Sequence, residues 1–222
     1  MQTQTLNPVR PPAPPAKPHD GTPAQKAVEK SLIEYDQGQG AFFLHSAGVT
    51  YAAAISQYGF LTHAYWGPSL APQNLNLPIP SRGRAFSPNP IPGDADFSLD
   101  TTPLEYPVYG RSDFRSPALE IVHSSVGART LDLRYSHHRI VGGKQCLENL
   151  PSVHTDSLAE AATLLVTLRD ESIKIAVELS YTVFAEHPVI VRSARIINEG
   201  EETFALRRAL SCSIDFPPEF SN

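Results

Sequence analysis

The sequence has few cysteines and lacks the motifs that mark most cofactor-dependent enzymes. It contains two cysteines, Cys146 and Cys212, too few for a disulfide framework and without the spacing of a zinc site. Because Cys212 continues the apolar alternation of residues 204–214, we expect it to be a buried, unreactive thiol. The Gly-Gly-Lys word in "VGGKQ" lacks the remaining glycine and the Ser or Thr of a phosphate-binding loop. The sequence therefore predicts no metal and no cofactor.

An excess of positive charge and long hydrophobic runs are also missing. The 18 Lys and Arg residues are outnumbered by 23 Asp and Glu residues, for a net charge of −5, which argues against nucleic acid as the main partner. No run reaches the length of a transmembrane helix, and the opening "MQTQTLNPVRPPAPPAKPHDG" lacks the apolar core of a secretory signal. We therefore expect a cytoplasmic protein that does not enter a membrane.

Proline, in contrast, is abundant and unevenly placed. Seven of the 21 prolines fall in the first 23 residues, where large apolar side chains are few, so residues 1–30 are predicted to be a disordered leader. Seven more prolines lie between residues 68 and 92, which excludes both a helix interior and a central strand. That second segment is interpreted as a long ordered loop within a domain spanning residues 31–222.

The rest of the chain alternates like β-strands. In "IKIAVELSYTVF" (173–184) the apolar residues Ile173, Ile175, Val177, Leu179, Tyr181 and Val183 fall on one face and polar residues on the other, the period-two pattern of a half-buried strand. Turns are expected at Ala47-Gly48, Tyr58-Gly59 and Val126-Gly127, and "INEGEE" is interpreted as a hairpin link. Helical periodicity is nearly absent. We therefore predict an all-β fold, a large antiparallel sandwich of two stacked sheets with no (β/α)₈ barrel.

Paired catalytic groups do not stand out. Asp94 and Asp96 sit in a Pro/Gly loop and, like Glu201 and Glu202 at a predicted hairpin tip, are interpreted as solvated turn acids. The adjacent histidines of "SHH" (136–138) would face opposite sides of a strand, so a packing role is favoured over a shared metal.

Aromatic residues mixed with Arg and Asp are the remaining chemical signal. "HAYWG" (63–67) and "EYPVYGRSDFR" (105–115) combine flat rings with charged hydrogen-bonding groups, as sugar sites do. The structural alternative is that Trp66 anchors the core, and that Asp113 and Arg115 form a pair fixing a turn at Gly110. Composition alone leaves both interpretations open.

Several of these segments resemble the N-terminal domain of glycoside hydrolase family 36 α-galactosidases. The matching words are "GFLTHAYWG", "RAFSPNP", "FSLDTTPLEYPVYGRSDFRSPAL", "LRYSHHRIVGGK", "LENLPSV", "AATLLVTLRD", "LSYTVF", "VIVRSARIINEG" and "LRRALSCSIDF". They occur in the family's order from about residue 31 to residue 216.

The resemblance implies a β-supersandwich that precedes a catalytic (β/α)₈ barrel in an enzyme that removes α-linked galactose from raffinose, stachyose and melibiose. The family retains configuration with two aspartates of the barrel and needs neither metal nor cofactor. No catalytic residue can be assigned here, so this chain alone is expected to be inactive and to be a fragment that works with a barrel in the same or another chain.

The resemblance also implies roles in oligomers and at the rim of an active site. In relatives a substrate-binding aspartate precedes the word "RAFSPNP", but Gly83 stands at that position here. Arg84 keeps its match and is the first rim candidate, followed by Trp66 and Asp113. The alternatives are a non-catalytic galactoside-binding domain and a scaffold or oligomerisation module, which sugar titration and sizing chromatography would distinguish.

Overall fold

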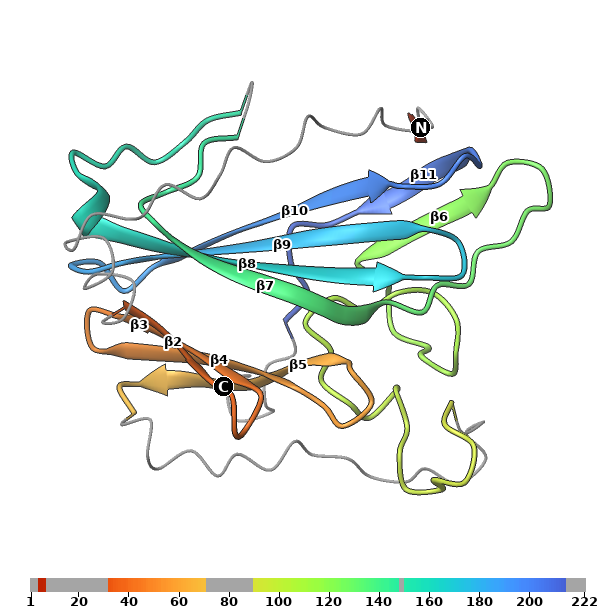
Figure 1. The fold of residues 1–222 in the computed structure, drawn as a ribbon, viewed down its shortest axis with the longest axis horizontal. Coiled ribbons are helices and arrows are strands. Elements are labelled where there is room, and N and C mark those ends of the chain that lie inside the picture. Colours follow the sequence, from red (N-terminus) through yellow and green to blue (C-terminus); the bar gives the residue numbers. More distant parts are fainter. Residues whose placement is uncertain (1–3, 7–31, 71–89, 148–149, 215–222) are drawn as a thin grey trace, which may run out of the picture.

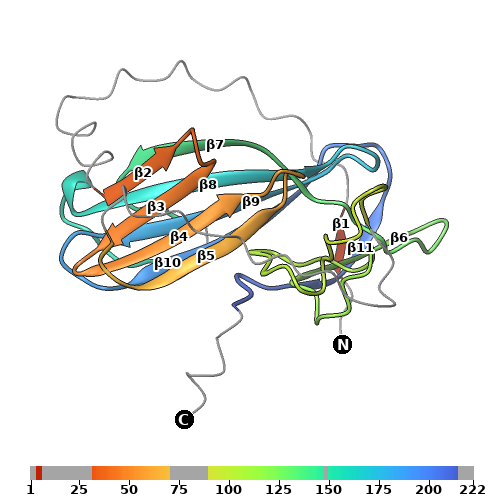
Figure 2. The same ribbon diagram turned by 90° about the horizontal axis from the view of Figure 1, so that it is seen from below.

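The chain folds into two stacked antiparallel sheets, with a smaller third sheet at one end (Figures 1 and 2). The computed structural model describes residues 4–6, 32–70, 90–147 and 150–214. One large sheet has the order β10-β9-β8-β7. Its strands are β7 (Arg134–Gly142), β8 (Ala161–Asp170), β9 (Ile175–Phe184) and β10 (Ile190–Asn198). A single 3₁₀ turn, η2 (Leu158–Glu160), leads into β8.

The second large sheet is a meander with the order β2-β3-β4-β5. Its strands are β2 (Ile33–Asp36), β3 (Ala41–Ser46), β4 (Val49–Ile55) and β5 (Leu61–Pro68). Figure 2 shows this sheet lying over the first, with β5 along the same edge of the sandwich as β10. The expected antiparallel sandwich without a barrel is therefore confirmed.

A third sheet of three strands was not expected from the sequence. It has the order β1-β11-β6, with β1 (Gln4–Leu6), β6 (Leu119–His123) and β11 (Phe204–Ala209). Within the predicted leader, residues 4–6 thus pair with β11, and the other residues up to 31 lie outside the described part. The interpretation of "INEGEE" as a hairpin link is wrong, because β10 pairs with β9 whereas β11 pairs with β6 and β1.

Residues at the three predicted turns adopt the left-handed backbone conformation that these turns require. Ala47 and Gly48 have φ of 34° and 85°, the conformation that a two-residue hairpin loop needs. Gly59 (φ 78°) and Gly127 (φ 69°) adopt the same region in the other two predicted turns. Glycine tolerates this region because it has no Cβ. The signals at Gly48 and Gly59 placed the turns between β3, β4 and β5 correctly, whereas Gly127 lies within the longer connection between β6 and β7.

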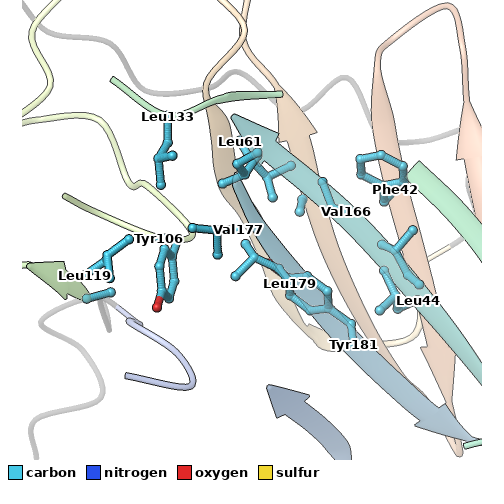
Figure 3. Close-up of a cluster of buried hydrophobic side chains, with 14 of the residues drawn as sticks. Phe42, Leu44, Leu61, Tyr106, Leu119, Leu133, Val166, Val177, Leu179 and Tyr181 are labelled. Atoms are coloured by element: carbon cyan, nitrogen blue, oxygen red, sulfur yellow. The ribbon is translucent and has the colours of Figure 1, made fainter. Parts of the chain in front are cut away.

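The core lies between the two large sheets, where alternate strand residues meet (Figure 3). Phe42 and Leu44 of β3 face Val166 of β8 and Leu179 of β9, and all four are at most 1% exposed. Each such side chain contributes roughly 1.5–3 kcal/mol when fully buried. The alternation predicted for β9 is confirmed on its inner face, where Ile175, Val177, Leu179, Tyr181 and Val183 are all buried. The other face is not the exposed side of a half-buried strand, because Ala176, Thr182 and Phe184 are buried as well.

The alternation predicted for residues 204–214 holds only in part. Strand β11 ends at Ala209, Leu210 is 43% exposed, and Cys212 beyond it is only half-buried. The expectation of a buried Cys212 is therefore wrong. Within the described ranges, no helix is long and apolar enough to span a membrane.

Candidate functional site

Two of the predicted site residues can be placed and two cannot. Gly83 and Arg84 fall in residues 71–89, outside the described part of the chain. Trp66 lies near the end of β5, and Asp113 lies in the segment between β5 and β6. Trp66 and Asp113 have different surroundings. These surroundings help to decide between a sugar-binding role and a structural role for each residue.

Asp113 is held by a neighbouring arginine. The side chain is 2% exposed, and both of its oxygens accept from Arg115: Nε donates to Oδ1 at 3.0 Å and Nη2 to Oδ2 at 2.9 Å. Arg115 Nη2 also donates to the carbonyl of Leu99 at 3.0 Å, and the Asp113 amide donates to the carbonyl of Gly110 at 3.2 Å. This geometry favours the structural interpretation, a pair that fixes the turn after Gly110.

Trp66 is not a core anchor, because its side chain is 43% exposed. The strand register places it directly opposite Tyr51 of β4. The two rings meet edge to face, with centroids 6.3 Å apart and planes at 64°. One side of the indole therefore rests on a buried tyrosine while another part faces solvent.

Behind Trp66 lies a buried polar cluster centred on Glu105, which is 1% exposed. Arg192 of β10 forms an ion pair with Glu105, with Nη2 2.9 Å from Oε2. The hydroxyls of Tyr51 and Tyr181 donate to Oε1 and Oε2, the second at 2.8 Å. His63 Nδ1 lies 3.2 Å from Oε1. We call these five residues the Glu105 cluster.

The charge of Arg192 sets the ionisation of the Glu105 cluster. Burial by itself would raise the pKa of Glu105, but Arg192 and the hydrogen bonds from His63 and Tyr51 outweigh it, so the pKa lies below its ordinary value. Burial and the nearby Glu105 charge raise the pKa of Tyr51 and that of Tyr181 well above 10.0. The stable state is thus a carboxylate facing a guanidinium, with both phenols protonated.

The Glu105 cluster joins parts of the chain that are distant in sequence. Tyr51 and His63 come from one large sheet, Tyr181 and Arg192 from the other, and Glu105 from the loop after β5. Glu105 begins the segment "EYPVYGRSDFR" but is not among the site residues predicted from the sequence. The sequence feature that could have identified Glu105 is its position between the apolar Leu104 and Tyr106. Such neighbours indicate a buried carboxylate, and a buried carboxylate needs a cationic partner.

Asp94, one of the two acids of the Pro/Gly loop, has a structural role. Asp94 Oδ1 accepts from the backbone amides of Asp96 and Phe97 at 2.9 and 3.1 Å, which closes a turn. The hydroxyl of Tyr58 also donates to Asp94. These bonds, the one from Tyr58 foremost, lower the pKa of Asp94.

The adjacent histidines separate as the sequence predicted. His137 is exposed, whereas the ring of His138 packs against Tyr35 and Phe42 with centroids 4.4 and 4.8 Å apart. No group of three or more His, Cys, Asp or Glu side chains among the described residues could hold a metal ion.

A small cavity lies under the loop between β5 and β6, lined by Leu99, Val108, Asp113 and Leu131 among others. It is large enough for about one water molecule and far too small for a sugar. Trp66 is not among the residues that line this cavity.

Comparison with known proteins identifies what the chain is similar to. Residues 59–221 match the family model described as the glycosyl hydrolase family 36 N-terminal domain. The chain is 42% identical over 185 residues to alpha-galactosidase AgaA of Geobacillus stearothermophilus, covering 83% of this chain and 25% of that enzyme. It is 38% identical over 190 residues to alpha-galactosidase Mel36A of Lactobacillus acidophilus, covering 85% and 26%.

Solved structures agree with these matches. The crystal structure of GH36 alpha-galactosidase AgaB from Geobacillus stearothermophilus superimposes with a TM-score of 0.78 at 42% identity, covering 83% of this chain and 25% of that one. A variant of AgaA in complex with raffinose gives a TM-score of 0.74 at 42% identity, covering 80% and 24%. The chain thus spans about a quarter of the length of these relatives.

Proposed function

The chain belongs to the glycosyl hydrolase family 36 N-terminal domain family, and we propose that it serves as the β-sandwich domain of a retaining α-galactosidase. The observation that carries the proposal is the match of most of the chain, in sequence and in fold, to the N-terminal quarter of such enzymes. The activity then resides in the complete enzyme, with the catalytic barrel in the same or a separate polypeptide.

The described carboxylates support a non-catalytic role for this domain. A retaining glycosidase needs one carboxylate as nucleophile and one carboxyl as acid, facing each other across the sugar. The buried acids of the described part are all engaged elsewhere. Glu105 pairs with Arg192, Asp113 pairs with Arg115, and Asp170 accepts from the backbone amides of Asp132 and Ser172.

Terminal α-linked galactose is the proposed substrate group. Solved relatives were crystallised with raffinose and with stachyose, and the proposal extends this class, together with melibiose, to the complete enzyme that contains this chain. Neither metal nor cofactor is required in the proposed reaction.

In this proposal the domain contributes residues to the rim of the active site, where they contact the substrate. Trp66 is the placed candidate that geometry supports best, because part of its ring faces solvent. Asp113 is weaker, since Arg115 occupies both of its oxygens. Arg84 stays a proposal on sequence grounds, with Gly83 where relatives carry a binding aspartate.

The proposal includes a homo-oligomer and a cytoplasmic location. Exposed apolar side chains outside the sandwich support an interface, above all Phe114 at 76% and Val126 at 72% exposed. Two free cysteines and no disulfide between them fit a reducing compartment.

The exposed face of Trp66 also favours a second candidate, a domain that binds galactosides without the barrel. Calorimetry with raffinose, melibiose and galactose tests it, and no heat signal with any of the three would remove it.

The mass of the native protein tests the leading proposal. Antibodies raised against this chain would isolate the protein that contains it from its source, under native conditions. We expect a mass several times the 24.2 kDa of this chain, since it spans a quarter of its relatives. A native species of about 24.2 kDa, alone and without a barrel partner, would contradict the proposal.

A further inference from the structure

Strand β5 carries an irregularity that decides where Trp66 points. Opposite β4, Ala52 pairs with Tyr65 but the next residue, Ala53, pairs with His63, so Ala64 is an extra residue in β5. In a regular strand, residues three apart face opposite sides of the sheet. One inserted residue restores the same side, so His63 and Trp66 both lie on the face of Tyr51 and Ala53.

That face is the inner face of the sandwich. Tyr51 and Ala53 belong to the main core and are each 2% exposed. Without the bulge, Trp66 would fall on the opposite face, where Ala52 and Tyr65 pack together. The bulge therefore brings the indole to the edge of the sandwich along which β5 and β10 run, beside the Glu105 cluster.

Tyr51 is the residue on which Trp66 rests, and it is fixed at both ends. Its backbone pairs within β3-β4-β5, and its hydroxyl donates to Glu105. Arg192 Nη1 lies 3.3 Å from the same hydroxyl. Because Glu105 is in turn ion-paired with Arg192, the phenol ring has little freedom to move.

We propose that Tyr51 is a positioning residue that, with the Ala64 bulge, holds the half-exposed indole of Trp66 in one orientation as a stacking face for a sugar ring. This proposal rests on the proposed function of the rim. An aromatic face binds the apolar side of a pyranose, and an already ordered ring loses less entropy on binding. Tyr51 thus affects sugar affinity although it is buried.

The fluorescence of Trp66 tests the positioning directly, because the chain has a single tryptophan. Tyr51→Phe removes only the hydroxyl that reaches Glu105, and Tyr51→Leu removes the ring. Tyr35→Leu is the matched control, since Tyr35 contacts Phe42 and His138 instead. Circular dichroism confirms that each variant is folded before its fluorescence is compared.

We expect Tyr51→Phe to raise acrylamide quenching of Trp66 and to lower its fluorescence anisotropy. A folded Tyr51→Leu should show a larger change with a red-shifted emission, and Tyr35→Leu should match the wild type. Unchanged quenching and anisotropy in a folded Tyr51→Phe protein would overturn the proposal, whether or not Tyr51→Leu folds. An equal change in Tyr35→Leu would also overturn it, because the effect would not be specific to Tyr51.

Titration with raffinose separates this inference from the function on which it rests. A Trp66 response in the wild type that needs more raffinose in Tyr51→Phe supports the whole proposal. No response in the wild type would overturn the role of Trp66 as a sugar face. The family assignment would be untouched by that result, because it is tested by mass and by activity.

Discussion

Glu105 and Arg192 form a buried ion pair between the two large sheets, with Oε2 and Nη2 2.9 Å apart and side chains 1% and 8% exposed. The pair connects the loop after β5 to strand β10. Two tyrosines complete its hydrogen bonds, Tyr51 from β4 and Tyr181 from β9. The Glu105 cluster therefore links the loop after β5 to both large sheets. It also fixes Tyr51 in β4, which pairs with Trp66 in β5.

Removing one partner of this pair should destabilise the domain strongly. Glu105→Leu leaves Arg192 buried without its counter-charge, which costs about 3–5 kcal/mol. Urea unfolding followed by circular dichroism measures the loss. The double variant Glu105→Leu/Arg192→Met should recover most of it, because two apolar side chains need no pairing. A single variant as stable as the wild type would contradict the central place of the pair.

The same carboxylate makes stability depend on pH. Its folded pKa lies below the ordinary value of 4.5, so the folded state holds the proton less tightly than the unfolded state does. The stabilisation is complete above pH 4.5 and is lost as the pH falls through the folded pKa. The difference in unfolding free energy between the wild type and Glu105→Gln should therefore shrink below pH 4.5. A constant difference from pH 7 to pH 3 would contradict this assignment.

Asp113 and Trp66 should respond differently to truncation. Asp113→Ala removes the charged acceptor of Arg115 and should cost about 2 kcal/mol of stability. Trp66→Ala removes a 43% exposed ring and should change stability less, while weakening any binding of raffinose measured by calorimetry. Thermal and urea unfolding of the two variants make the comparison. A larger loss of stability in Trp66→Ala would reverse the two assignments.

Gly110 should resist substitution for two separate reasons. Its φ is +104°, and an added Cβ would lie 2.7 Å from Cγ2 of Thr130. Gly48 has φ +85° but no atom within 4 Å of an added Cβ, so Gly48→Ala isolates the backbone cost. We expect Gly110→Ala to lose more than the roughly 1 kcal/mol of a purely conformational change. Equal losses of stability in Gly110→Ala and Gly48→Ala would show that Thr130 moves aside without cost, and would contradict this prediction.

The strands were predictable because their signals are local. Alternation marked β9, and glycines in left-handed conformation marked the turns between β3 and β4 and between β4 and β5. The third sheet was not predictable, because β1, β6 and β11 are far apart in sequence and pair only in the folded chain. Between β10 and β11 the chain also passes from one large sheet to the third sheet. A short polar link does not specify such a change of sheet.

The site was predicted only in part, for a related reason. Trp66 was noted as an aromatic residue, but its orientation depends on one extra residue, Ala64, that appears only in the strand register. Glu105 was missed because its partners, Tyr181 and Arg192, lie 76 and 87 residues further along the chain. Buried pairs over such separations carry no pattern within a single sequence.

The most direct test of the account is α-galactosidase activity after complementation. This chain is mixed with a separately produced segment of Geobacillus stearothermophilus AgaA that lacks its own matched N-terminal quarter, and hydrolysis of raffinose is measured. We predict no hydrolysis by this chain alone, little by the truncated enzyme, and a clear gain when both are present. A stable mixed complex without any gain in hydrolysis, or hydrolysis by this chain alone, would contradict its role as the non-catalytic sandwich of such an enzyme.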